Sequence, residues 1–170
     1  MKLPDLLEQL RATHHQGRIQ RMLELGRRAA AEPEVAELLR TMSGKGFYLR
    51  HMALFAALAA RDGEAFERTA LRDPSRILRR MALRMAAKIC SDEQLMRLLD
   101  ELSGKELRLV VVSLQKRHRP ALLERWLLSQ AKVPTELLGF AGEEFLDKHR
   151  EQLLERGSAC DWTRVTRRHP

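Results

Sequence analysis

The sequence predicts an all-α protein built from stacked helical repeats, on two observations. Its 170 residues are 44% apolar but only 5% aromatic, so Leu, Ala, Met and Val must form most of the core, which suits helices better than sheets. In addition, residues 77–83 (ILRRMAL) match residues 48–54 (YLRHMAL) and, more faintly, residues 106–112 (ELRLVVV), at a spacing of 29 residues each time. A fixed period of this size is the signature of a repeat architecture.

Start and stop signals divide the first half of the chain into helices. Apolar residues recur at helical spacing after Asp5, and residues 14–17 (HHQG) indicate the break that follows. Pro33 suits the first turn of a later helix, which residues 43–46 (SGKG) end. Residues 61–63 (RDG) close a nearly all-apolar helix. The predicted helices are 4–12, 18–31, 34–42, 47–60 and 64–71.

The second half continues the same alternation. Residues 73–75 (DPS) start the central helix, and Ser91 is a suitable cap for the next, which has acidic residues in its first turn. Residues 110–112 (VVV) have β propensity, but the repeat register favours a helix there. We expect one helical domain over residues 1–157 and a mobile basic tail over 158–170. The predicted helices are 73–90, 92–102, 105–117, 121–130, 136–140 and 143–156.

The central repeat resembles a known family. Asp73-Pro74, followed six residues later by Arg79 and then by Ala82 on the second helix of a pair, is similar to the short form of the HEAT repeat. The resemblance covers about residues 34–130. It implies a right-handed α-solenoid of antiparallel helix pairs, as in HEAT and ARM superhelices, used as a scaffold or binding surface and tied to no particular chemistry.

The chain departs from the family in its aspartates. The family's Asp and Arg form a ladder between neighbouring repeats. Here the arginine recurs as Arg50 and Arg108, but Gly44 and Leu102 stand where the aspartate would recur. Because Asp73 precedes Arg79 at ladder spacing, we expect a structural role for Arg79 and none for Arg80.

Four cations line up on the central helix. At 100° per residue they gather opposite an apolar face of Leu78, Met81, Ala82, Met85, Ala86 and Ile89. Like charges at i, i+4 repel by a few tenths of a kcal/mol per pair, so either acidic side chains on neighbouring helices or a binding partner must offset this cost. We call these four the basic ridge: Arg76, Arg80, Arg84 and Lys88.

The 29-residue period transfers this face to the other copies. The copy before has Phe47, His51, Phe55 and Ala59, and the copy after has Lys105, Leu109, Ser113 and Arg117. In HEAT-like solenoids the second helices line one concave wall, which here would run from an aromatic patch to a basic one unless the N-terminal helices cover the phenylalanines. The candidate partner-binding residues are Phe47, His51, Phe55, Arg76, Arg80, Arg84, Lys88, Lys105, Arg117 and Arg119.

Charge alone does not choose the partner. The net charge is +8 and the isoelectric point is near 10.2, but 24 of the 31 basic residues are arginine, which a GC-rich genome also produces. We expect a non-enzymatic scaffold that binds another, possibly acidic, protein. Nucleic-acid binding through the basic ridge is the alternative. A HEAT-like DNA glycosylase is a remoter one, for which Trp126, Asp161 and Trp162 supply the residue types.

Other chemistry finds little support in the sequence. Residues 43–46 and 103–105 (SGK) resemble parts of a phosphate loop, but lack its upstream Gly, its Ser or Thr after Lys and its preceding strand. The adjacent His14 and His15 cannot present both rings to one metal ion as an i, i+4 pair would. We expect no metal, cofactor or small-molecule substrate.

The remaining reactive groups have structural interpretations. Cys90 lies beside the apolar face, where burial as a small hydrophobe is expected. His118 lies among three cations, so we expect it to belong to a basic patch. With two cysteines in no framework spacing, no secretory leader and no apolar run of about 18 residues, we expect a cytoplasmic protein without a membrane span.

Overall fold

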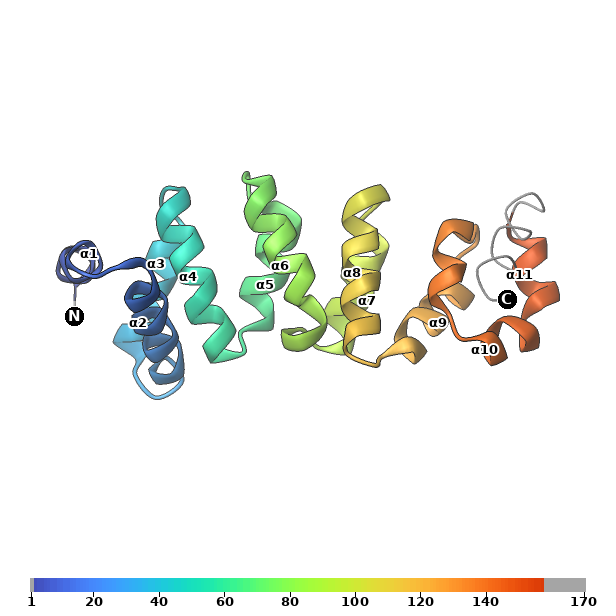
Figure 1. Cartoon of the computed structure of the whole chain (residues 1–170), viewed down its shortest axis with the longest axis horizontal. Helices are drawn as coiled ribbons and strands as arrows, with labels where there is room; N and C mark the ends of the chain where they lie inside the picture. Colours follow the sequence, from blue (N-terminus) through green and yellow to red (C-terminus); the bar gives the residue numbers. More distant parts are fainter. Residues whose placement is uncertain (1, 158–170) are drawn as a thin grey trace. The chain divides into compact units, whose positions relative to one another are not determined.

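The computed structural model describes residues 2–157, and every regular element in that range is a helix (Figure 1). The expected tail over 158–170, with Cys160, Asp161 and Trp162, lies outside the described residues. No helix of the described range is long and apolar enough to cross a bilayer. The helices are α1 (Leu3–Ala12), α2 (His15–Arg28), α3 (Pro33–Ser43), α4 (Phe47–Ala60), α5 (Gly63–Arg72), α6 (Arg76–Ile89), α7 (Asp92–Glu101), α8 (Gly104–Lys116), α9 (Pro120–Ser129), the 3₁₀ helix η1 (Thr135–Phe140), α10 (Glu143–Lys148) and α11 (Arg150–Glu155).

These helices form two compact units, each described below by itself. The first contains the residues up to Ala82 together with Ile89–Ser91. The second contains Leu83–Lys88 and the residues from Asp92 onward. The expectation of one domain over residues 1–157 stays a prediction.

In the first unit, a short turn joins the antiparallel helices α4 and α5 (Figure 1). Arg61 ends α4 in the left-handed region (φ 54°), and the N–H of Asp62 donates to the carbonyl of Ala57 over 3.0 Å. The Asp62 carboxylate then accepts the N–H of Ala65 over 2.9 Å and so caps α5. Two residues therefore end one helix and start the next.

Helices α1 to α4 form one hydrophobic core cluster of the first unit. Its buried side chains are Leu6, Leu10, Met22, Leu25, Val35, Leu38, Met42, Met52, Ala53 and Ala56. Helices α2 and α4 approach most closely at Gly26, where a Cβ atom would lie 2.1 Å from the carbonyl oxygen of Ala56. Only glycine permits this approach without movement of one helix.

We expect Gly26→Ala to destabilise the chain. Forcing a methyl group into this contact should cost about 1 to 3 kcal/mol, more than the roughly 0.5 to 1 kcal/mol that Ala gains over Gly within a helix. Gly44→Ala is the matched control, because the nearest atom to its Cβ would lie 3.7 Å away. Urea unfolding should show a lower midpoint for the first variant alone, and equal midpoints would contradict the packing described.

The second unit buries Trp126, of which 3% is exposed, and its indole N–H donates to Asp100 Oδ1 over 2.7 Å. Ser113 is also buried. Its hydroxyl donates to the carbonyl of Arg84 and accepts the N–H of Ala87, each over 3.2 Å. The expectation that Ser113, in the third repeat copy, lies on the partner-facing side is therefore wrong, because its hydroxyl makes its hydrogen bonds inside the unit.

Other differences from expectation have local causes. The first helix ends at Ala12 as expected, but α2 begins at His15 and includes Gly17, so the break between them covers only Thr13 and His14. The expected last helix is divided at His149, whose backbone (φ −110°, ψ 14°) is not helical. On α6, Met81 and Met85 are half-buried, whereas Leu83 and Ala87 are buried. The buried face of α6 is thus rotated from the predicted one.

Candidate partner-binding surface

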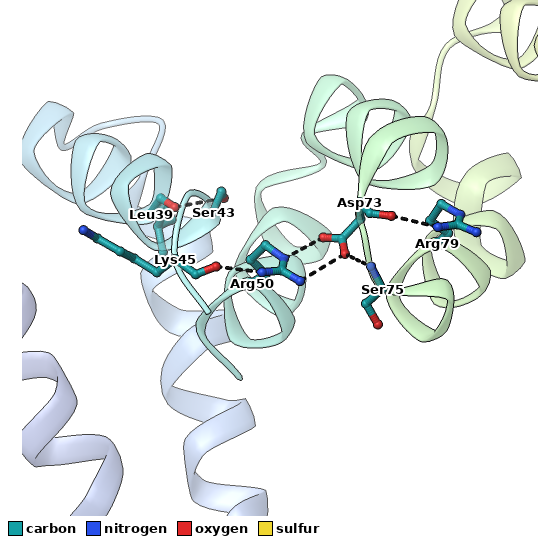
Figure 2. A network of polar contacts seen from close by, with 7 residues as sticks. All are labelled: Leu39, Ser43, Lys45, Arg50, Asp73, Ser75 and Arg79. Atoms are coloured by element: carbon teal, nitrogen blue, oxygen red, sulfur yellow. Dashed lines mark hydrogen bonds and ion pairs between the residues drawn. The ribbon is translucent and has the colours of Figure 1, made fainter. Parts of the chain in front are cut away.

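The N-terminal turns of α4 and α6 are tied together by Asp73, which lies in the turn before α6 (Figure 2). Arg50 Nε donates to Asp73 Oδ2 over 2.9 Å, and Arg50 Nη2 donates to Oδ1 over 3.3 Å. The Asp73 side chain is 6% exposed and that of Arg50 is 19% exposed. This is a bidentate, largely buried ion pair, the geometry in which guanidinium and carboxylate bind most strongly.

Backbone groups complete the arrangement, which we call the Asp73 network. Arg50 Nη1 donates to the carbonyl of Lys45 over 2.7 Å, and the N–H of Ser75 donates to Asp73 Oδ1 over 2.7 Å (Figure 2). Arg79 Nη1 donates to the backbone carbonyl of Asp73 over 2.9 Å. One buried carboxylate therefore fixes the turn before α4 and the turn before α6 relative to each other.

The geometry modifies the expected ladder. The Asp73 carboxylate pairs with the arginine of the preceding repeat, Arg50, while Arg79 holds the backbone of Asp73. In the third copy, the guanidinium of Arg108 lies 5.6 Å from the ring centre of Phe140. The arginine position of the repeat therefore has a different neighbour in this copy than in the first.

We expect Asp73→Ala to lower the free energy of unfolding by about 2 to 4 kcal/mol, because it leaves a largely buried guanidinium without its counter-charge. Arg50→Ala should lower the free energy of unfolding by a similar amount. The loss in the double variant should be smaller than the sum of the two single losses, by about 1 kcal/mol or more. Arg79→Ala should also destabilise, whereas Arg80→Ala should stay within about 0.5 kcal/mol of the parent. If chemical denaturation showed that the stability losses of the Asp73 and Arg50 variants are strictly additive, the two side chains would not stabilise the fold as an ion pair.

An aromatic stripe runs along α4. The ring centres of Phe47 and His51 are 5.9 Å apart, and those of His51 and Phe55 are 5.1 Å apart. Phe47 is exposed, but Phe55 is half-buried against the core of the first unit. Burial, and to a lesser extent the neighbouring His15, lower the pKa of His51 below its ordinary value of 6.5. The stripe therefore presents a neutral imidazole at pH 7.

The large apolar side chains that the described residues leave exposed lie at the start of α4 and α6. Phe47 is 44% exposed, Tyr48 39% and Ile77 69%. Tyr48 and Ile77 occupy the same position of the 29-residue repeat, two residues before Arg50 and Arg79. Sequence analysis did not select Tyr48 or Ile77, although their matching positions could have indicated a shared role.

The basic ridge is divided between the units. Arg76 and Arg80 belong to the first, and Arg84 and Lys88 to the second. Arg80 is half-buried and the other three are exposed. Within residues 2–157, none of the four side chains has a hydrogen-bonding or ion-pair partner, in contrast to Arg50 and Arg79. No Asp or Glu side chain of the described residues forms an ion pair with these four cations to offset their mutual repulsion.

The remaining predicted residues differ in availability. Lys105 and Arg117 are exposed. Arg119 is half-buried, and its guanidinium pairs with Asp92 and donates to the carbonyl of Ala87 over 3.2 Å. The guanidinium of Arg119 is therefore already bound to groups inside the second unit.

Charge is segregated between alternate helices. Helices α4, α6 and α8 contain nine Lys and Arg residues and one acidic residue, Glu106. Helices α3, α5 and α7 contain eight Asp and Glu residues and four arginines. A solvated helix face usually carries charges of both signs. Helices α4, α6 and α8 therefore differ in charge from α3, α5 and α7.

A cavity of about 270 Å³ lies beside the Asp73 network in the first unit. Arg50, Arg68, Arg72 and Thr69 are among its lining residues. The side chains of Arg68 and Arg72 lie one turn apart on α5 and have no ion-pair partner in the described part of the chain, so the lining of this hollow carries uncompensated positive charge. Sequence analysis missed it, and the i, i+4 arginines of α5 were the available signal.

Metal chemistry has no site in this range. Among residues 2–157, no group of three or more His, Cys, Asp or Glu side chains could hold a metal ion. Cys90 is buried, and its thiol lies 3.7 Å from the carbonyl oxygen of Gly63, as expected of a cysteine that packs as a small hydrophobe.

Comparisons with models of known protein families, with curated proteins and with solved structures found no match for this chain. Its function is therefore inferred from its own residues.

Proposed function

We propose that this chain is a non-enzymatic helical-repeat module that binds another protein through its second helices, α4, α6 and α8. The HEAT-like α-solenoid is part of this proposal, since such a stack would place these helices on one wall. The observation that carries it is the charge segregation: of the residues on α3 to α8, nine of the thirteen Lys and Arg but only one of the nine Asp and Glu lie on α4, α6 and α8. In addition, the basic ridge has no internal counter-charge among the described residues.

Uncompensated charge of one sign favours a partner of the other sign. Complementary charge steers association and rejects partners of like sign. Because the ridge cations repel one another on α6, a partner that brings carboxylates relieves a cost already present in the free chain.

A protein partner accounts for the apolar side chains better than nucleic acid does. Aromatic rings can stack on bases, so Phe47 and Tyr48 suit either partner. Ile77, at 69% exposure, has no ring, and an exposed aliphatic side chain gains most from an apolar partner surface. Trp126 is buried and bonded to Asp100, so it cannot stack on a base as a glycosylase would require.

Nucleic-acid binding is a second candidate, favoured by the same unpaired cations. It predicts an affinity for DNA that depends little on base sequence and falls steeply as the salt concentration rises.

The test is a double charge reversal, Arg76→Glu with Arg80→Glu, in the first unit. Stability should stay within about 0.5 kcal/mol or rise, because no ion pair is lost and α6 gains a carboxylate in a first turn that has none. A protein partner isolated with the parent chain from its native host should lose about tenfold or more in affinity for the variant.

The parallel measurement is binding to random duplex DNA across a salt series. The proposal predicts binding barely measurable at ~150 mM salt. Tight DNA binding at that salt, abolished by the reversal, would favour the second candidate. A captured protein that binds parent and variant equally would contradict the proposed face.

A further inference from the structure

We infer that the N-terminal ends of α4 and α6 form one docking patch for an acidic protein segment that carries apolar side chains. This inference rests on the proposed function and names its partner class and point of attachment. The docking patch consists of Phe47, Tyr48, His51, Ile77, Arg80 and Met81, all within the first unit.

The Asp73 network makes the two helix ends one surface. Arg50 and Arg79 both bind Asp73, so the turns that carry Tyr48 and Ile77 are held at a fixed separation. Figure 2 shows Arg50 and Arg79 approaching Asp73 from opposite sides. Because the network is largely buried, the patch exists before a partner arrives, which reduces the entropy lost on binding.

Helical spacing completes the patch on each side. On α6, Ile77 is followed by Arg80 and Met81 at i+3 and i+4, so the three share one face, on which Ile77 is exposed and the other two are half-buried. On α4, Phe47 and Tyr48 precede His51 at the same spacings, and the Phe47 and His51 rings lie 5.9 Å apart. Each helix therefore presents at least one exposed apolar side chain beside a nitrogen-bearing one.

The charge of the patch selects an acidic occupant. Neither α4 nor α6 contains an Asp or Glu, and the carboxylate of Asp73 is already paired with Arg50. Arg76 and Arg80 have no partner within the described residues. The lowered pKa of His51 keeps its ring neutral and compatible with apolar contact at pH 7. A segment whose carboxylates pair with the arginines and whose apolar side chains pack on Tyr48 and Ile77 would complement both the charged and the apolar side chains of this surface.

Fluorescence anisotropy with defined probes tests this on the full chain. The first probe is a labelled synthetic peptide of Glu and Leu. The second replaces every Leu by Ser, the third replaces every Glu by Lys, and the fourth is a labelled oligothymidylate of similar charge. The Glu–Leu peptide should bind about tenfold or more tighter than its Glu–Ser counterpart, and the Lys–Leu peptide should not bind measurably.

Variants then locate the site. Ile77→Ser and Tyr48→Ser should each weaken the Glu–Leu peptide about fivefold, with the melting temperature unchanged because both side chains are exposed. Arg80→Gln should weaken it and reduce its salt dependence. Arg125→Gln is the matched control, since Arg125 is exposed on α9 in the second unit, and it should change neither.

The inference is overturned if the Glu–Ser peptide or the oligothymidylate binds as tightly as the Glu–Leu peptide, or if Ile77→Ser leaves binding unchanged. Either result could accompany a successful charge-reversal experiment, in which case the chain binds its protein elsewhere or through charge alone. If these probes succeed but the captured protein binds the charge-reversed variant normally, that protein binds elsewhere: the proposed function fails, while the patch still binds acidic peptides with apolar side chains.

Discussion

The surface of the first unit depends on the ion pair between Arg50 and Asp73. A carboxylate with 6% exposure is costly to bury, and it is tolerated here because a bidentate guanidinium and the N–H of Ser75 satisfy it. The same guanidinium holds the carbonyl of Lys45, so one interaction orders both the turn before α4 and the turn before α6. Relative motion of those turns would leave charge buried and unpaired, which makes the arrangement rigid.

Rigidity at this point would favour binding at the proposed docking patch. Exposed apolar side chains on separate mobile turns would bind weakly, since each would have to be ordered by the partner. Here Tyr48 and Ile77 stand two residues from the two arginines that bind Asp73. The cations beside them are unpaired within the described residues, whereas Arg119, in the second unit, is held by Asp92. The arginines therefore fall into two groups: those paired within the fold and those without a partner among the described residues.

Much of the helical organisation was predictable from the sequence, and the long-range contacts were not. Helix α4 matches its predicted bounds, Phe47–Ala60, because strong turn signals flank it on both sides. The repeat period put Arg50 and Arg79 in equivalent positions, but it could not decide which of them the Asp73 carboxylate would choose. The nearer arginine in sequence, Arg79, donates to the backbone carbonyl of Asp73. Burial of Leu83, Ala87 and Ser113 likewise depends on which elements pack against them, and one helix's own periodicity carries no such information.

The most direct test of this account is amide hydrogen exchange in the first turns of α4 and α6, compared between the parent chain and Asp73→Asn. The variant keeps the size of the side chain but removes the charge that binds Arg50. If the Asp73 network orders both turns, exchange should accelerate in the two segments together, while α9 in the second unit keeps its protection. Acceleration next to residue 73 alone, with the start of α4 unchanged, would show that the two helix ends are ordered independently and would contradict the account.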